Sequence, residues 1–441
     1  MEFIIQASQF LLSLSLLIIL HELGHFIPAK LFNTKVEKFY LFFDYKFSLF
    51  KKKVGETVYG IGWIPLGGYV KIAGMIDESM DTEQMQEEPK PWEFRSKPAW
   101  QRLIIMIGGV TVNVILALVI YSSMFMYYGE AYIPVDNIEQ GLMVTDKGKS
   151  IGLENGDLVI RVDDRRLERY SEINKELVLS ESSIEVLRDG KNIQLNVKPE
   201  DKEALLEGDG PIVSLRFPFI IGAFSDTSAA RDAGVQQLDS LVSINGESLA
   251  HYDQYTAEIP KYAGDTLKLG LYRDKSFKEY SILVPADGRI GIRPGGTRDI
   301  TDYYTKEYDK FTFWEAIPAG WNKTTGVLKD YIRQLKLIFT PSTGAYKKVG
   351  GFIAIGSQFP KVWDWEWFWG ITAFLSIMLA FLNILPIPAL DGGHVVFVLI
   401  EMITGRKPSD KVLEYAQMVG FFLLLALIIL ANGNDVLGLF K

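Results

Sequence analysis

The chain has 441 residues, which is too long for one ordinary domain, so we expect two to four folded units. Apolar residues make up 48% of it and charged residues 23%, a mixture that predicts membrane spans joined to water-soluble parts. The formal net charge of −8 argues against a nucleic-acid-binding protein, because a broad basic surface is missing. Cysteine is absent, so disulfides and thiolate metal sites are excluded, and any metal must be held by His, Asp or Glu.

Four segments are long and apolar enough to cross the hydrocarbon core of a bilayer, which takes about 20 helical residues. They run from about Phe3 to Phe26, Leu103 to Tyr127, Phe368 to Leu390, and Met418 to Leu430. The fourth segment is short, and Tyr415 is an alternative start for it.

Basic residues predict how these spans are oriented. The loop between the first two spans is rich in lysine, and the loop after the third span holds Arg406, Lys407 and Lys411. Because an excess of Lys and Arg marks cytoplasmic loops, both loops are expected in the cytoplasm. Both chain termini and the long segment from about residue 130 to 310 are then expected on the outer side.

The outer segment contains an internal repeat. Gly152–Val162 aligns with Gly234–Ile244, and in both copies a turn sequence leads into alternating apolar residues, which is typical of a turn followed by a strand. Each copy continues into a β-like run that contains an Arg-Asp pair, namely Ile184 to Val197 and Leu267 to Val284. We therefore expect two small β-rich domains in tandem, joined by the charged stretch Pro199 to Gly210.

A further segment, Phe311 to Phe339, mixes apolar and basic residues at helical spacing. This pattern favours an amphipathic helix on a membrane surface, and a helix packed on the β-rich domains is the alternative. The expected organisation is 1–130 for the first two spans, 131–210 and 211–297 for the β-rich domains, 298–362 for the amphipathic region, and 363–441 for the last two spans.

The end of the first span carries the motif His21-Glu22-Leu23-Gly24-His25. Residues at positions i and i+4 share one face of a helix, so both imidazoles can bind one metal ion, with Glu22 beside its open position. Zinc in such a site lowers the pKa of bound water to about 7, and Glu22 can accept the proton. A chance match is the alternative, but ionisable residues at the end of a span are costly and usually functional.

A third ligand is expected, and Asp391 is the best candidate. It follows the third span, which runs inward like the first, so both motifs arrive at a similar depth. Pro386 and Pro388 interrupt that span, and unwound backbone at membrane depth is tolerated only beside protein or a polar cavity. A capping role for Asp391 is the alternative, and His394 could replace it as the ligand.

Three motifs together resemble those of the site-2 protease family: the His-Glu-x-x-His span, the segment from Asn383 to Gly393, and the loop Pro65-Leu-Gly-Gly-Tyr-Val-Lys71. The order of the motifs and the tandem insert look most like the bacterial regulator-of-sigma-E type, in which the two inserted domains resemble PDZ domains. The resemblance covers nearly the whole chain. It implies zinc bound by His21, His25 and Asp391, Glu22 as the general base, and Asn383 in contact with the substrate backbone.

The resemblance also implies that Ile64 to Gly74 forms a membrane-associated β-hairpin on the cytoplasmic side, where Gly67, Gly68 and Tyr69 bind extended substrate. This is physically reasonable, because a helical substrate must unwind before its amide reaches the metal, and a strand edge can hold the unwound peptide. A glycine-rich turn in a cytoplasmic loop is the alternative.

The implied function is that of a zinc metalloendopeptidase in a bacterial inner membrane, with both termini and the PDZ-like domains in the periplasm and the active site near the cytoplasmic side. Its substrates would be membrane proteins cut within or near a transmembrane segment, either a pre-trimmed anti-sigma factor in regulated intramembrane proteolysis or remnant signal peptides. A membrane scaffold with PDZ-like domains and no protease activity is the alternative, and it leaves the metal-binding motif unexplained.

The chain departs from the family pattern at several places, one of which is Pro28, soon after the His pair. Gly109-Val-Thr-Val-Asn113 lacks the proline usual in the second span, and Phe42-Phe-Asp-Tyr-Lys46 replaces an expected Gly-Phe-Gly segment. In the second copy of the repeat Leu238 stands where the first has Gly156, so we expect a different turn there.

Overall fold

The chain forms two compact units. The first unit comprises Met1–Glu130, Lys310–Phe339 and Tyr346–Lys441, and the second comprises Ala131–Asp309 and Thr340–Ala345. The predicted boundary between residues 297 and 298 lies outside the described residues, and the finer division into five regions stays a prediction. The structure, a computed structural model, describes residues 2–75, 88–207, 210–295 and 300–438.

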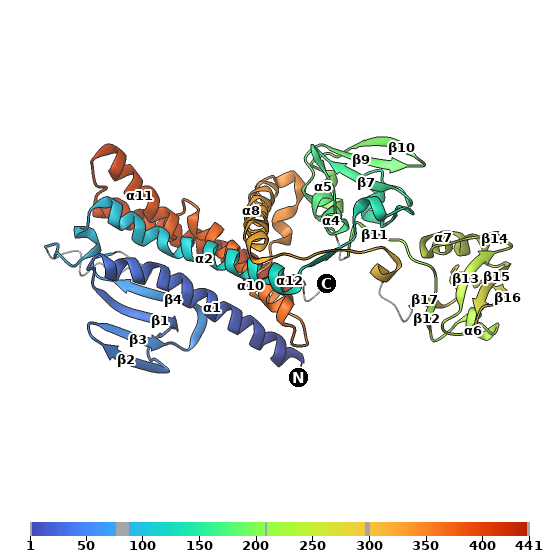
Figure 1. Ribbon diagram of the computed structural model, residues 1–441, viewed down its shortest axis with the longest axis horizontal. Coiled ribbons are helices and arrows are strands. Elements are labelled where there is room, and N and C mark those ends of the chain that lie inside the picture. The colour runs from blue at the N-terminus through green and yellow to red at the C-terminus, as the bar shows by residue number, and fades with distance from the viewer. Residues whose placement is uncertain (1, 76–87, 208–209, 296–299, 439–441) are drawn as a thin grey trace. The chain divides into compact units, whose positions relative to one another are not determined.

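Within the described residues, four helices are long and apolar enough to cross a membrane. They are α1 (Glu2–Leu31), α2 (Ala99–Tyr128), α10 (Trp365–Ile384) and α12 (Asp410–Gly438), at the positions of the four predicted spans. The ribbon in Figure 1 shows α1, α2 and α10 running alongside one another, and α2 packs against both of the others. The helix α2 is therefore the central helix of this unit.

Small and polar residues hold these helices together. Gly24 and Gly108 let α1 and α2 approach closely, because a Cβ on Gly24 would lie 2.4 Å from the Gly108 carbonyl oxygen. Thr372 of α10 donates a hydrogen bond of 2.9 Å to Ser13 of α1, and Ser376 donates one of 2.8 Å to the backbone carbonyl of Asn113 in α2. Hydrogen bonds and close backbone approach are the usual means of helix association where water is absent.

The third predicted span is wrong at its end. The helix α10 stops at Ile384, residues 385–390 are not helical, and a separate helix α11 (Asp391–Thr404) follows, which the sequence did not predict. The predicted interruption at Pro386 and Pro388 is confirmed, because proline has no amide hydrogen to continue the helical hydrogen bonds. The helices α1 and α12 extend beyond the predicted limits at both ends, and α1 continues through Pro28.

The predicted amphipathic helix is present as α8 (Phe313–Ile338). It packs on α2 and α10, with Gly320 so close to α2 that an added Cβ would lie 2.2 Å from Ser122 Oγ. These contacts within the first unit do not support packing on the β-rich part. Its position on a membrane surface stays a prediction.

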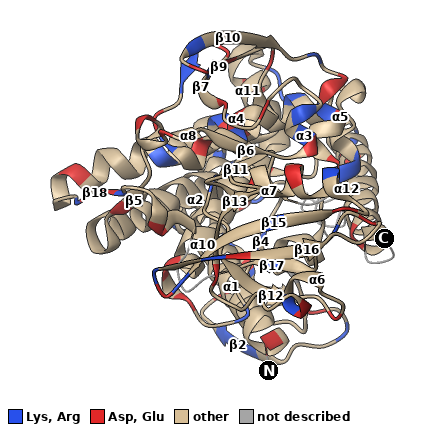
Figure 2. Cartoon of the chain, turned by 90° about the vertical axis from the view of Figure 1, so that its right-hand side faces the viewer, with Lys and Arg blue, Asp and Glu red and all other residues tan. Residues whose placement is uncertain are grey.

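A four-stranded sheet lies along α1, in the strand order β2-β3-β1-β4. The strand β1 (Val36–Phe43) runs parallel to β3 (Thr57–Ile61) and antiparallel to β4 (Ile64–Ile72). The prediction of a hairpin over Ile64 to Gly74 is therefore wrong: the segment is one strand at the edge of the sheet, paired with β1. The opposite edge is β2 (Phe50–Val54), whose three lysines are blue in Figure 2.

The second unit contains two β-rich lobes, each with its own apolar core. In each lobe a four-stranded sheet is accompanied by a two-stranded one, with the orders β10-β9-β7-β8 and β11-β6 in the first lobe and β14-β13-β15-β16 and β12-β17 in the second. The predicted β runs are thus confirmed as paired strands. The strands are β6 (Leu142–Val144), β7 (Leu158–Val162), β8 (Arg165–Arg166), β9 (Ser183–Arg188), β10 (Lys191–Asn196), β11 (Val213–Leu215), β12 (Ile221–Phe224), β13 (Ser240–Ile244), β14 (Glu247–Ser248), β15 (Thr266–Arg273), β16 (Ser276–Leu283) and β17 (Ile292–Pro294). Among the described residues, the remaining helices and strands, apart from 3-10 turns, are β5 (Glu130–Tyr132), α3 (Asp146–Lys149), α4 (Tyr170–Leu179), α5 (Asp201–Leu206), α6 (Ala229–Asp232), α7 (Tyr252–Glu258), β18 (Glu307–Asp309) and α9 (Phe352–Ser357).

The two lobes repeat the same buried ion pair. Asp157 accepts hydrogen bonds from Arg188 in the first lobe, and Asp239 accepts them from Arg273 in the second. These are the Asp residues of the repeated turn and the Arg residues of the two Arg-Asp runs, so the pairing explains why both recur. Leu238 keeps the left-handed turn of Gly156 instead of changing it, with φ of 67° against 100° for the glycine.

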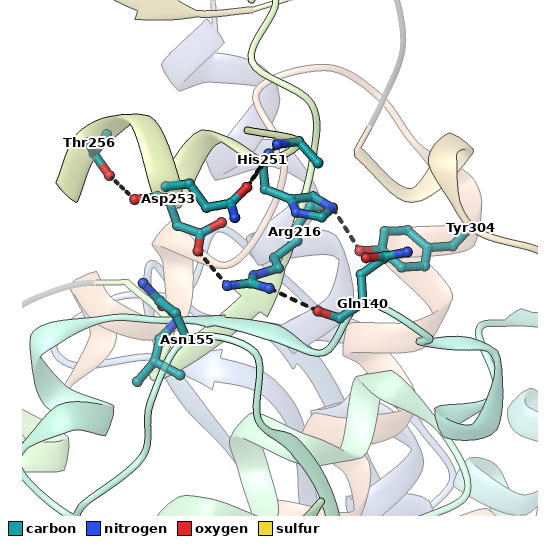
Figure 3. A network of polar contacts seen from close by, with 10 residues as sticks. Gln140, Asn155, Arg216, His251, Asp253, Thr256 and Tyr304 are labelled. Carbon is teal, nitrogen blue, oxygen red and sulfur yellow. Dashed lines mark hydrogen bonds and ion pairs between the residues drawn. The ribbon is translucent and has the colours of Figure 1, made fainter. Parts of the chain in front are cut away.

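The stretch Pro199 to Gly210 is not a simple linker, because it contains α5, whose Leu205 is buried in the core of the first lobe. The contact between the lobes centres on Arg216, directly after β11 (Figure 3). Its guanidinium donates hydrogen bonds to Asp253 Oδ2 of α7 at 2.7 Å and to the Gln140 carbonyl at 3.1 Å. Arg216 therefore connects the second lobe to the first.

Candidate metal centre

The helix α1 places His21 and His25 on one buried face, as residues four apart must lie. Their Nε2 atoms are 3.4 Å apart. Gly109 of α2 lies against both rings, where an added Cβ would approach His25 Nε2 to 2.4 Å and His21 Cε1 to 2.6 Å. The missing side chain at position 109 therefore makes the space that the two imidazoles occupy.

Asp391 reaches the same place from the first position of α11. Its Oδ2 lies 3.3 Å from His21 Nε2 and 3.2 Å from His25 Nε2. The turn before it is tight: Ala389 has φ of 83°, and a Cβ on Gly392 would lie 2.2 Å from the Leu385 carbonyl oxygen. The two residues after Asp391 are glycines because this turn folds back on the start of α11.

The three donor atoms fit a zinc ion. Ligand atoms about 2.0–2.1 Å from zinc at tetrahedral corners are about 3.3–3.4 Å apart, and the separations here are 3.2, 3.3 and 3.4 Å. The Asp391 Oδ2 atom is buried and accepts no hydrogen bond from the described part of the chain, as expected of an atom that faces a cation. Two imidazoles and one carboxylate, with one tetrahedral position left open, form the donor set of a catalytic zinc site.

Both imidazoles are oriented from α2. His25 Nδ1 lies 2.8 Å from the Ile105 carbonyl, to which it can only donate, so its Nε2 keeps a lone pair for the metal. His21 Nδ1 lies 3.1 Å from the Asn113 side-chain amide, whose other end, Oδ1, is buried and has no hydrogen-bond partner among the described residues. Oxygen and nitrogen of such an amide are assigned from their surroundings. Turning the amide over lets Oδ1 accept from His21 Nδ1–H and orients His21 in the same way.

Glu22 and Asn383 both lie beside these donors. The Glu22 carboxylate accepts a hydrogen bond from the Val70 amide of β4, so it is held on the side of α1 that faces the edge strand. Asn383, one residue before the end of α10, places its amide nitrogen 3.3 Å from His21 Nε2.

The strand β4 passes close to α1 at Gly68, and its Gly67 lies against a side chain of β1. A Cβ on Gly68 would lie 2.4 Å from Ile18 of α1, and one on Gly67 would lie 2.9 Å from the Phe43 ring. Tyr69 points elsewhere: its ring stacks on Tyr40, and its hydroxyl donates to Asp44 Oδ1 at 2.8 Å. The side chain of Tyr69 is therefore held by contacts within its own sheet.

The structure brings together His21, His25 and Asp391 as the one group of metal-binding side chains within its described residues, and His394 is not part of it. Sequence reasoning missed the residues that orient the imidazoles. The signal for Asn113 and Gly109 was present, because both belong to the Gly-x-x-x-Asn pattern of the second span. The Ile105 carbonyl carries no sequence signal, because every residue has a carbonyl.

A His-Glu-x-x-His helix completed by a distant aspartate, among helices long enough to span a bilayer, is the arrangement of an intramembrane zinc metalloprotease. Comparison with known proteins agrees. The profile described as peptidase family M50 matches residues 9–427, so the chain belongs to this family, the site-2 proteases. The prediction of a zinc protease is thereby confirmed, and the scaffold alternative is set aside.

Named relatives cover almost the whole chain. The regulator of sigma-E protease RseP of Escherichia coli is 28% identical over 463 residues, which is 99% of both chains. Protease RseP of Yersinia pestis is 27% identical over 463 residues and 97% of each chain. A Vibrio cholerae protein, provisionally named a zinc metalloprotease, is 27% identical over 458 residues and 97% of each chain.

Proposed function

We propose that this protein hydrolyses peptide bonds within or near transmembrane segments of other membrane proteins, with zinc bound by His21, His25 and Asp391. The observation that carries the proposal is the spacing of the three donor atoms, 3.2 to 3.4 Å, which matches three corners of a zinc tetrahedron. Zinc, when bound, supplies the Lewis acidity that makes water a nucleophile near neutral pH.

Glu22 is proposed as the general base. It follows His21 on α1, and its hydrogen bond to the Val70 amide keeps the carboxylate on the side of β4. A carboxylate there accepts a proton from the attacking water and can return it to the leaving amine nitrogen. The same hydrogen bond ties the proton acceptor to the strand on which we place the substrate.

The substrate is proposed to bind as an added strand on β4. This strand is at the sheet edge, and the glycine at position 68 lets it lie close to α1 without a side chain in between. Main-chain groups of Gly67, Gly68 and Tyr69 would pair with the unwound peptide, because backbone pairing gives affinity with little dependence on sequence. Asn383, beside His21, would donate its side-chain amide to a peptide carbonyl and help to position it for attack.

Substitution separates these roles. His21→Ala should lose the metal, whereas Glu22→Gln should keep about one zinc per chain and lose cleavage of a membrane-embedded reporter substrate. Asn383→Ala should cleave more slowly with its zinc intact. A Glu22→Gln protein that cuts at the wild-type rate would show that the general base is another group.

We further propose that the two β-rich lobes are PDZ-like domains on the periplasmic side of an inner membrane, and that they restrict which substrates enter. The repeated ion pair and turn support two copies of one domain type. A filter of this kind suits substrates already trimmed outside the membrane, such as an anti-sigma factor or a remnant signal peptide. The Escherichia coli relative is named as a regulator of sigma-E protease, which favours the anti-sigma-factor class.

Deleting residues 135–295 tests whether the two lobes restrict substrate entry. The zinc content should stay the same, and cleavage should extend to substrates that keep a bulky outer domain. A deletion variant that holds zinc but cuts nothing would show that the lobes dock substrates instead. Zinc content and cleavage must therefore be measured on one sample.

A further inference from the structure

The three metal-binding side chains come from two helices, α1 and α11, which both pack on α2. The helix α2 carries none of the three, yet it orients His25 through the Ile105 carbonyl and His21 through Asn113. Asp391 differs from the two histidines, because it belongs to α11, a short helix joined to α10 by the non-helical residues 385–390. Its position therefore depends on what holds α11 in place.

An ion pair holds the far part of α11 to α2. Arg102 Nη2 contacts Glu401 Oε1, and Arg102 Nε also donates a hydrogen bond of 3.0 Å to the Lys97 carbonyl. Both side chains are largely buried, with 7% of Arg102 and 18% of Glu401 exposed. Between this pair and the metal centre, Val395 of α11 packs in the same apolar cluster as Ile105.

The geometry lets this ion pair control the position of Asp391. Arg102 lies about one helical turn before Ile105 on α2, and Glu401 lies ten residues, or about 15 Å, along α11 from Asp391. Fixing α11 on α2 at this distance sets both the rotation of α11 and its position along its axis. A buried ion pair contributes little net stability because its desolvation is costly, but it can select one arrangement of the packed helices.

We propose that Arg102 and Glu401 are positioning residues for the metal centre, and that their ion pair places Asp391 Oδ2 within bonding distance of the ion. The inference rests on the proposed metal site and adds residues that bind neither metal nor substrate. With this ion pair included, α2 orients all three metal-binding side chains.

The test measures zinc affinity in the full-length protein, purified in detergent, by competition with a chromophoric chelator. Glu401→Gln and Arg102→Leu should each weaken zinc binding severalfold, less than the roughly 10–100-fold cost of removing a residue that contacts a metal ligand directly. The exchanged pair Arg102→Glu with Glu401→Arg should recover most of that affinity. Met402→Leu, at the adjacent exposed position of α11, is the matched control and should bind zinc like the wild type.

Folding is checked on each sample by hydrogen exchange of α2 and α10. Folded single variants with wild-type zinc affinity overturn the positioning role. If the single variants do not fold, the exchanged pair decides: restored affinity supports the role, and a folded exchanged pair that binds zinc weakly overturns it. His21→Ala in the same assay tests the metal site itself, because zinc retained there refutes the site and not merely the ion pair.

Discussion

Adding one methyl group at Gly109 should be enough to disable the metal centre. In the Gly109→Ala protein the new Cβ would lie 2.4 Å from His25 Nε2 and 2.6 Å from His21 Cε1. Ordinary contacts need about 3.5 Å or more, so the rings or the helices must separate by about 1 Å. A zinc site tolerates deviations of only about 0.2 Å in its ligand distances. We therefore expect zinc affinity to fall by about 100-fold, at the upper end of what outer-residue substitutions cost.

The assay is elemental analysis after dialysis against a buffer of fixed free zinc, with helix content measured by circular dichroism on the same sample. Gly326→Ala is the matched control, because a Cβ on this glycine of α8 would have no described atom within 4 Å beyond its own stretch of helix backbone. The control should keep its zinc and gain up to about 1 kcal/mol from better helix propensity. A Gly109→Ala protein that is folded and holds one zinc with unchanged affinity refutes the reasoning, because the two rings would then not need this space.

Three further outcomes are expected. Asn113→Ala should weaken zinc binding by about tenfold while the protein stays folded, measured by chelator competition, because His21 loses the group that orients it. Arg273→Leu should destabilise the second lobe by roughly 3–5 kcal/mol, seen as faster hydrogen exchange in β13 and β15, because it leaves Asp239 buried and unpaired. Burial alone would raise the pKa of Asp239, but hydrogen bonds from Arg273 and the Gln236 amide hold that pKa below its ordinary value. The stabilisation by this pair is therefore complete above the ordinary Asp range near pH 4 and should be lost as the pH falls through the lowered pKa. Leu238→Gly should stabilise the second lobe by about 1 kcal/mol in thermal unfolding, because an exposed leucine with φ of 67° gives way to a residue that adopts this conformation without strain.

The metal-binding side chains could be predicted from the sequence because metal chemistry restricts them to few residue types. The chain has no cysteine and four histidines in 441 residues, so two histidines spaced one helical turn apart at the end of an apolar span strongly indicate a shared metal ion. The repeat was visible for a similar reason. Its Asp and Arg residues recur at matching positions because each lobe needs the same buried pair, Asp157 with Arg188 and Asp239 with Arg273.

The elements that the sequence did not predict depend on contacts between distant segments. Pro386 and Pro388 predicted an interruption of the third span, but the sequence pattern did not show that a separate helix, α11, follows them. The segment from Ile64 has the turn residues of a hairpin, but pairing with β1 makes it a single edge strand. The pairing of β4 with β1 cannot be recognised from the local composition of either strand, because packing decides which strands pair.

The residues that position the metal-binding side chains are harder to find from sequence than those side chains themselves, for a physical reason. A ligand must offer a particular lone pair, whereas the groups that position it can be a backbone carbonyl, as at Ile105, or an empty space, as at Gly109. Such groups leave either no residue signature or one shared with ordinary helix packing. The Arg102–Glu401 pair is an intermediate case: its charges are unusual beside apolar helices, but 299 residues separate the partners, and only the fold shows that they meet. A search for positioning residues in a membrane metalloprotease should therefore begin at the helix that carries no ligand.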